Sequence, residues 1–118
     1  MASHNQLGKE AEQMAINYLT KNGYEILHCN WRYSRYEIDI IAVKDQLLRI
    51  IEVKSLRSTD VRLPEESVTK KKFRHLVKAA DEFLFQNQQY RHAQFDILSI
   101  VFNRKNDPEY FLIEDVYL

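Results

Sequence analysis

Glycine, cysteine and long apolar runs are scarce in this chain of 118 residues, and each shortage excludes a class of protein. The two glycines, Gly8 and Gly23, are too few and wrongly spaced for the glycine-rich loops that bind dinucleotides or nucleoside triphosphates. The single cysteine, Cys29, excludes an internal disulfide bond and a zinc site made of several cysteines. No apolar run approaches the ~18 residues of a membrane span, and residues 1–13 lack the apolar core of a secretion signal. We therefore expect a cytoplasmic protein with no membrane partner.

Charge is balanced over the whole chain but not along it. The 17 basic and 17 acidic residues give a net charge of zero, which argues against general affinity for nucleic acid. Residues 49–78 nevertheless carry nine basic and four acidic residues, whereas the segments before and after them have net charges of −1 and −4. Such a positive band is typical of a solvated loop and helix, or of a surface that holds a phosphate backbone.

The spacing of apolar residues predicts one domain over residues 1–118, of the α/β class, with element order α-β-β-β-α-β-β. Helical spacing predicts one helix over residues 7–22, which Asn22-Gly23 ends, and a second helix that Thr69 caps. Strands are predicted where β-branched and aromatic residues are dense, at 24–33, 36–43, 47–54, 94–102 and 110–117. Residues 44–46 form a hairpin turn, and residues 55–68 form a loop that contains Pro64. We expect one mixed sheet flanked by two helices.

Two of these strands each carry a carboxylate within an apolar run, Asp39 in one and Glu52 in the next. Burial of an ionised carboxylate costs several kcal/mol unless another group compensates. If the hairpin turn has two or four residues, paired positions sum to 91, so that Asp39 faces Glu52 and Glu37 faces Lys54, all on one side. A three-residue turn would instead place Asp39 on the far face.

Opposed carboxylates repel each other, and a divalent cation between them removes that penalty. Oxygen ligands of this kind suit Mg²⁺ or Mn²⁺. Lys54, two positions after Glu52, is then placed to orient a nucleophilic water and to neutralise charge that develops on a phosphate. The alternatives are an ordinary surface pair of Glu52 with Lys54 or a buried salt bridge between Asp39 and Lys54. Glu12, which borders the apolar stripe of the first helix, is either a third acid above the sheet or an ordinary helix residue.

Three further features have two interpretations each. Asp96 interrupts an apolar strand as Asp39 does, and a pair with Arg32 or with Lys72 is open. Cys29 has no evident catalytic partner, so we expect a buried thiol rather than a reactive one. Aromatic residues that can pack in the core or stack on bases are Trp31, Tyr33 and Tyr36.

A series of short motifs resembles those of the YraN-like family of small bacterial proteins over residues 8–101. The motifs follow in the family's order: Gly8-Lys9-Glu10-Ala11-Glu12, Tyr24-Glu25-Ile26-Leu27, Asn30-Trp31-Arg32, Glu37-Ile38-Asp39-Ile40-Ile41-Ala42, Glu52-Val53-Lys54, Val68-Thr69 with Lys72, and Phe95-Asp96. The fold that such proteins resemble is that of the restriction-endonuclease-like, or PD-(D/E)XK, superfamily, which includes archaeal Holliday-junction resolvases. Tyr36 departs from the family pattern, which usually has glycine at this position.

The resemblance implies a role for each acidic and basic candidate. Asp39 and Glu52 would be metal ligands for Mg²⁺ or Mn²⁺, Lys54 the catalytic lysine, and Glu12 the acid that the resolvase branch supplies from its first helix. Basic residues that would contact nucleic acid are Arg32, Arg57, Lys70, Lys71, Lys72 and Arg74.

The first functional hypothesis is therefore a metal-dependent nuclease that hydrolyses DNA phosphodiester bonds, with branched and flap DNA as candidate substrates. The second is a nucleic-acid-binding adaptor of a repair or recombination complex with little or no turnover. The third is a protein-interaction domain in which the acidic residues and Lys54 form a structural ion-pair network. Because a small nuclease needs a second copy to cut both strands, the first hypothesis also predicts a homodimer.

Overall fold

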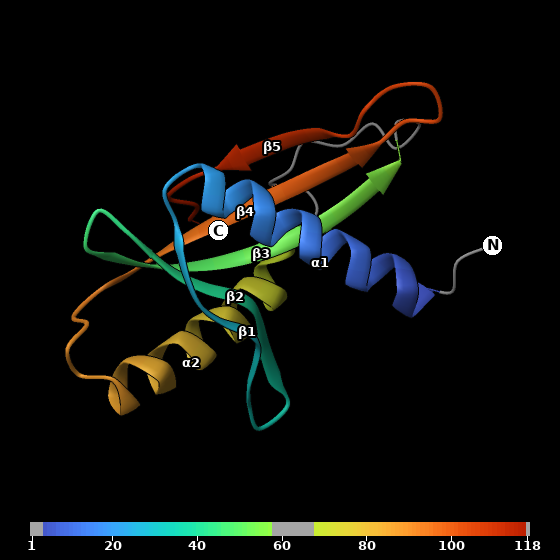
Figure 1. Ribbon diagram of the computed structural model, residues 1–118. Coiled ribbons are helices and arrows are strands. Elements are labelled where there is room, and N and C mark those ends of the chain that lie inside the picture. The colour runs from blue at the N-terminus through green and yellow to red at the C-terminus, as the bar shows by residue number, and fades with distance from the viewer. Residues whose placement is uncertain (1–3, 58–67, 118) are drawn as a thin grey trace.

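The computed structural model describes residues 4–57 and 68–117, and it describes only the backbone of residues 4–7. Its helices and strands follow the predicted order (Figure 1). They are α1 (His4–Lys21), β1 (Glu25–Tyr33), β2 (Tyr36–Lys44), β3 (Leu47–Arg57), α2 (Lys70–Gln86), β4 (Ala93–Phe102) and β5 (Glu109–Ile113). The predicted loop residue Pro64 lies outside the described residues.

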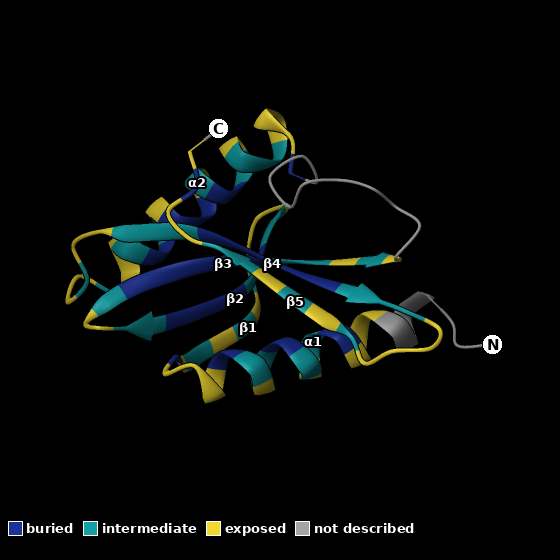
Figure 2. Ribbon diagram, turned by 90° about the horizontal axis from the view of Figure 1, so that it is seen from above, coloured by how far each residue is buried: buried dark blue, intermediate teal, exposed yellow. Residues whose placement is uncertain are grey.

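The strands form one mixed sheet in the order β1-β2-β3-β4-β5. Only β3 and β4 are parallel, because α2 connects them, and the other neighbours are antiparallel. The sheet separates the two helices, so that α1 covers one face and α2 the other (Figure 2). This α/β architecture is consistent with a restriction-endonuclease-like fold. No helix in the described part of the chain is both long and apolar enough to cross a membrane.

Two strand ends differ from the prediction by three residues or more. β3 runs to Arg57 rather than to residue 54, because its parallel pairing with β4 continues as far as Arg57 opposite Phe102. β5 ends at Ile113 rather than at residue 117, because Asp115 adopts a positive φ of 59° and turns the chain. The predicted helix stop and cap are present: Gly23 has a φ of +89°, and the Thr69 hydroxyl accepts a hydrogen bond from the Lys72 N–H at 3.1 Å.

The predicted register of the β2–β3 hairpin is confirmed. Its two turn residues, Asp45 and Gln46, both have positive φ (54° and 64°), as a two-residue turn of the hairpin type requires. The ladder ends with Ile40 opposite Ile51, a pair that sums to 91 as predicted. Asp39 and Glu52 therefore lie one residue beyond the last ladder pair, Asp39 before Ile40 and Glu52 after Ile51, where the pairing of the two strands ends.

Asp96 is fully buried, and its ion pair is with Arg49 (Oδ2–Nη1 3.6 Å). The predicted pairings with Arg32 and with Lys72 are therefore wrong. Sequence spacing did not indicate this contact because Arg49 and Asp96 lie on β3 and β4, which the α2 crossover brings side by side. Arg49 also pairs with Glu114 (3.2 Å), so this one member of the basic band is used inside the protein.

Candidate functional site

The candidate site begins with an irregularity in β2 at Asp39. Ile38 and Ile40 are two residues apart and would share a face in a regular strand. Instead, Ile38 packs in the cluster beneath α2, whereas Ile40 packs in the cluster beneath α1. The neighbouring strand β1 has the same irregularity at Asn30, whose φ is 53°: Cys29 packs beneath α1, whereas Trp31 packs beneath α2. Asp39 thereby leaves the regular alternation and stands at the gap between the strands.

The Asp39 carboxylate is fixed by the backbone of the next strand. Its Oδ2 accepts a hydrogen bond from the Val53 N–H at 2.9 Å. This hydrogen bond gives the Val53 N–H an acceptor beyond the end of the β2–β3 ladder, where β2 no longer supplies a backbone carbonyl. The aspartate is therefore held in one orientation beside Glu52 before any ligand binds.

Glu52 is a buried carboxylate whose loss of contact with water is only partly offset by nearby cations. Only 4% of the residue is exposed, and Oε2 has no hydrogen-bond partner. Burial, and then the negative charge of Asp39, raise the pKa of Glu52 to about 8, while the charges of Lys72 and Lys54 act in the opposite direction. Two carboxyl groups thus share a site that does not favour two negative charges.

Two lysines flank the Glu52 carboxylate, one on each oxygen. Lys54 Nζ lies 3.9 Å from Oε1, and Lys72 Nζ, from the first turn of α2, lies 3.9 Å from Oε2. Both ammonium groups remain partly exposed, with side-chain exposures of 31% and 38%. They can therefore contact a bound anion while staying beside the carboxylate. Lys72, predicted to contact nucleic acid, thus also lies beside Glu52, a position that the sequence did not indicate because it depends on the packing of α2.

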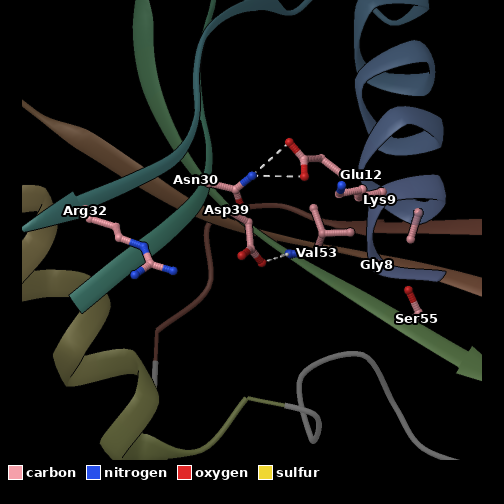
Figure 3. A pocket seen from close by; sticks show the side chains of 9 residues that line it. Gly8, Lys9, Glu12, Asn30, Arg32, Asp39, Val53 and Ser55 are labelled. Atoms are coloured by element: carbon pink, nitrogen blue, oxygen red, sulfur yellow. Dashed lines mark hydrogen bonds between the residues drawn. The ribbon is translucent and has the colours of Figure 1, made fainter. Parts of the chain in front are cut away.

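A surface cavity of about 580 Å³ opens on the α1 side of Asp39 (Figure 3). Glu12 projects from α1 toward Asn30 on β1, and Asn30 Nδ2 donates hydrogen bonds to both Glu12 oxygens at 2.9 Å. Glu12 thus faces the sheet, the first of its two predicted alternatives. The cavity is lined by Gly8, Lys9, Ala11, Glu12, Asn30, Arg32, Asp39, Val53 and Ser55.

The predicted placement of all four charged side chains on one face is wrong. Asp39 lines the cavity together with Val53, whereas Glu52 and Lys54, which alternate with Val53 along β3, do not. The two carboxylates approach each other across the end of the ladder instead. Glu37 does not lie opposite Lys54, because it pairs with Arg32 of β1 (3.5 Å).

The donor set fits a magnesium-like ion. Among the side chains that the structure describes, no group of three or more His, Cys, Asp or Glu residues could hold a metal ion. Two carboxylates are enough for Mg²⁺, which keeps several of its waters and commonly binds one or two carboxylates together with substrate phosphates. Oε2 of Glu52, which accepts no hydrogen bond and has Lys72 Nζ only at 3.9 Å, is the atom that such an ion would satisfy.

The other basic candidates lie around this pair rather than in it. Lys70, Lys71 and Arg74 are exposed on the first turns of α2, and Arg57 is exposed at the end of β3. Arg32, whose side chain is 74% exposed, lies at the rim of the cavity. The structure therefore gathers Lys54 and Lys72 at the carboxylates and leaves these five cations on the surrounding surface.

Cys29 is not prepared for nucleophilic chemistry. It is only partly buried, which differs from the buried thiol that was predicted. Burial, followed by the charge of Glu12 and a hydrogen bond to it, raises the pKa of this thiol. Because the thiolate is the reactive form, the raised pKa agrees with an unreactive cysteine.

Comparison with known proteins gives consistent matches over most of the chain. Residues 11–100 match a family model described as "Uncharacterised protein family UPF0102". A UPF0102 protein of Flavobacterium psychrophilum is 42% identical over 105 residues, which are 89% of this chain and 88% of the relative. Relatives from Bacteroides fragilis and Parabacteroides distasonis are 43% and 44% identical, and each match covers 86% of this chain and 84% of the relative. The matched segment contains both carboxylates and both lysines of the candidate site.

Proposed function

This chain belongs to the UPF0102 family, the YraN-like group that its motifs resemble, and we propose that it is a divalent-metal-dependent nuclease acting on DNA. The reaction is hydrolysis of a backbone phosphodiester bond: water adds to phosphorus, and the bond from phosphorus to the leaving sugar oxygen breaks. Branched and flap DNA are the substrates that we expect.

One observation carries the proposal. Glu52 is buried beside Asp39 with one oxygen that accepts no hydrogen bond, although two adjacent carboxylates destabilise the folded protein. A protein that needed only an ion pair at this point would be better served by one carboxylate and one lysine. A divalent cation accounts for both carboxylates, and oxygen donors favour Mg²⁺ or Mn²⁺.

In this mechanism Asp39 and Glu52 would hold the metal, and the Val53 N–H fixes the Asp39 carboxylate in one orientation. When bound, the ion supplies Lewis-acid polarisation of the phosphate and a lowered pKa for an attacking water. Lys54, beside Glu52, orients the water and offsets the charge that develops on the phosphate oxygens. Lys72 provides a second positive charge on the other side of the same carboxylate.

Glu12 serves the substrate side of the site. Its carboxylate faces the cavity that Asp39 also lines, and Asn30 fixes both of its oxygens. In that position the group can accept a hydrogen bond from a water or from the leaving hydroxyl. Arg32 at the rim of the cavity supplies a cation for the phosphate backbone.

The test is a cleavage panel of single-stranded, duplex, flap and four-way DNA with Mg²⁺ or Mn²⁺. We expect products that depend on metal and that chelator abolishes. Lys54→Ala should lower the rate by 10²-fold or more, on the order of the loss of one charge-stabilising group. Lys105→Ala, which removes an exposed lysine between β4 and β5, is the matched control. Absence of cleavage on every substrate, or equal rates for both lysine variants, would contradict the proposal.

A nucleic-acid-binding adaptor on the same fold is the second candidate. It is favoured by Lys54 and Lys72, whose ammonium groups lie 3.9 Å from the two Glu52 oxygens and offset the charge of this carboxylate without a metal. An adaptor would bind DNA with strong dependence on salt and with no response to chelator, and it would release no product. The same panel therefore separates the two functions.

A further inference from the structure

A second surface hollow lies between the tip of the β1–β2 hairpin and the outer side of α2. Its volume is about 510 Å³, and it is lined by Tyr33, Tyr36, Lys78, Asp81, Glu82 and Phe85. Two of its aromatic side chains are unusually open to solvent: Tyr33 is 41% exposed and Phe85 is 72% exposed. Exposed rings that share one hollow with a lysine are suited to a ligand that has both a flat apolar face and negative charge.

Positive charge collects on one side of this hollow, around Tyr36. The Arg35 guanidinium lies 5.5 Å and the Lys78 ammonium 5.8 Å from the centre of the Tyr36 ring. The His75 ring is 4.9 Å away. Burial lowers the pKa of His75, and so do the positive charges around it. Those charges belong to Lys71, Arg35, Lys78 and Lys72.

These cations connect the hollow to the carboxylate pair. Lys71, His75 and Lys78 follow one another at spacings of four and three residues, so they lie along one side of α2. At about 1.5 Å per residue, Lys78 is about 9 Å and Phe85 about 20 Å along the helix from Lys72, the lysine beside Glu52. A strand whose phosphates contact this row passes from the carboxylates to the aromatic rings.

The acidic residues of the hollow limit where the phosphates can lie. Asp81 and Glu82 come between Lys78 and Phe85 on α2, and their charges repel a phosphate. The row that can hold phosphate therefore ends at Lys78. Beyond it, the exposed rings of Phe85 and Tyr33 offer contact to bases rather than to the backbone.

We propose that this hollow binds the unpaired strand of a branched or overhanging nucleic acid. Phosphates contact Lys71, Lys78 and Arg35, and bases stack on Tyr33 and Phe85. A paired base is already stacked on both faces, so the exposed rings select unpaired bases, and such stacking tolerates any sequence. This proposal rests on the proposed nuclease function in one respect: the nuclease site defines the end from which the nucleic-acid strand runs toward the rings. At ~3.4 Å per nucleotide, the interval of about 20 Å from Lys72 to Phe85 corresponds to about six nucleotides.

The experiment measures binding without catalysis. Fluorescence anisotropy in EDTA compares a blunt duplex with duplexes that carry single-stranded overhangs of increasing length. We expect affinity to rise with the overhang and to level off near six nucleotides. Phe85→Ala should weaken binding of the overhang about 10-fold and leave the blunt duplex unchanged. Phe111→Ala, which removes an exposed ring of β5 (44%), is the matched control and should change neither affinity.

The outcomes are separable from those of the cleavage panel. Equal affinity of the wild type for blunt and overhanging DNA would overturn the proposal, and so would a Phe85→Ala variant that binds like the wild type. The latter result would fit a hollow that docks a protein. A selective loss of overhang binding supports the proposal even if no DNA is cleaved, because the assay needs no metal. Phe85 is largely exposed, so we expect the variant to fold, and its thermal unfolding checks this.

Discussion

Replacing Glu52 by glutamine should stabilise the metal-free protein, and by a larger amount as the pH rises. Burial and the adjacent Asp39 charge raise the pKa of Glu52 from an ordinary 4.5 to about 8. Between these two pH values the folded protein retains a proton that the unfolded chain has released. The folded state thus binds more protons, and its stability falls as the pH rises through this range.

The size of the effect follows from the same two values. At ~1.4 kcal/mol for each pKa unit, ionisation of Glu52 costs the folded state at most about 5 kcal/mol, all of it incurred by about pH 8. Glutamine has nearly the same shape and no ionisation, so the variant avoids this cost. Groups that do not contact Glu52 contribute equally to both proteins, so the difference in stability between them reports on Glu52 and its immediate neighbours.

The assay is urea unfolding in EDTA from pH 5 to pH 9. The free energy of unfolding of Glu52→Gln should exceed that of the wild type by a margin that grows up to about pH 8 and is constant above it. Added Mg²⁺ should narrow the margin, since it stabilises only the protein with both carboxylates. Glu109→Gln, at an exposed position of β5, should show no such trend. A margin that does not change with pH would refute the reasoning.

Three further outcomes are expected from the contacts of single side chains. Asp39→Asn keeps an oxygen for the Val53 N–H but loses a charge, so calorimetry should find Mn²⁺ binding at least about 10-fold weaker in a protein that still folds. Asp96→Ala leaves Arg49 buried with less compensation and should lower the free energy of unfolding by about 3 kcal/mol, with much of the loss recovered when Arg49→Met is added. Lys71→Ala should reduce the salt slope of single-stranded DNA binding by about 0.7, because this lysine contacts a phosphate of the unpaired strand; an unchanged slope would exclude that contact.

The hairpin that carries the two carboxylates could be predicted from the sequence because its determinants are local. A polar turn between two dense runs of isoleucine and valine indicates the hairpin, and its register follows once the turn has an even number of residues. The structure supplies that turn with Asp45 and Gln46, which both have positive φ. The proximity of Asp39 and Glu52 follows from that register, whereas the end of the ladder at Ile40 and Ile51 does not. The cap at Thr69 and the stop at Gly23 are equally local.

The parts that could not be predicted depend on contacts between distant elements. Asp39 leaves the regular alternation where β1 changes face at Asn30, and no periodicity in β2 alone encodes this. The Arg49–Asp96 ion pair requires the parallel alignment of β3 and β4, which only the α2 crossover creates. For the same reason Lys72, which reads as one more cation in a basic run, meets Glu52 only when α2 packs on the sheet.

The most direct test of the central claim is the crystal structure of the protein soaked in Mn²⁺, with the ion located from its anomalous scattering. The account predicts one peak between the Asp39 and Glu52 carboxylates, within about 2.0–2.2 Å of an oxygen of each, with Lys54 alongside. A map in which these two carboxyl groups bind no ion, and instead share a proton or pair with Lys54 and Lys72 alone, would contradict it.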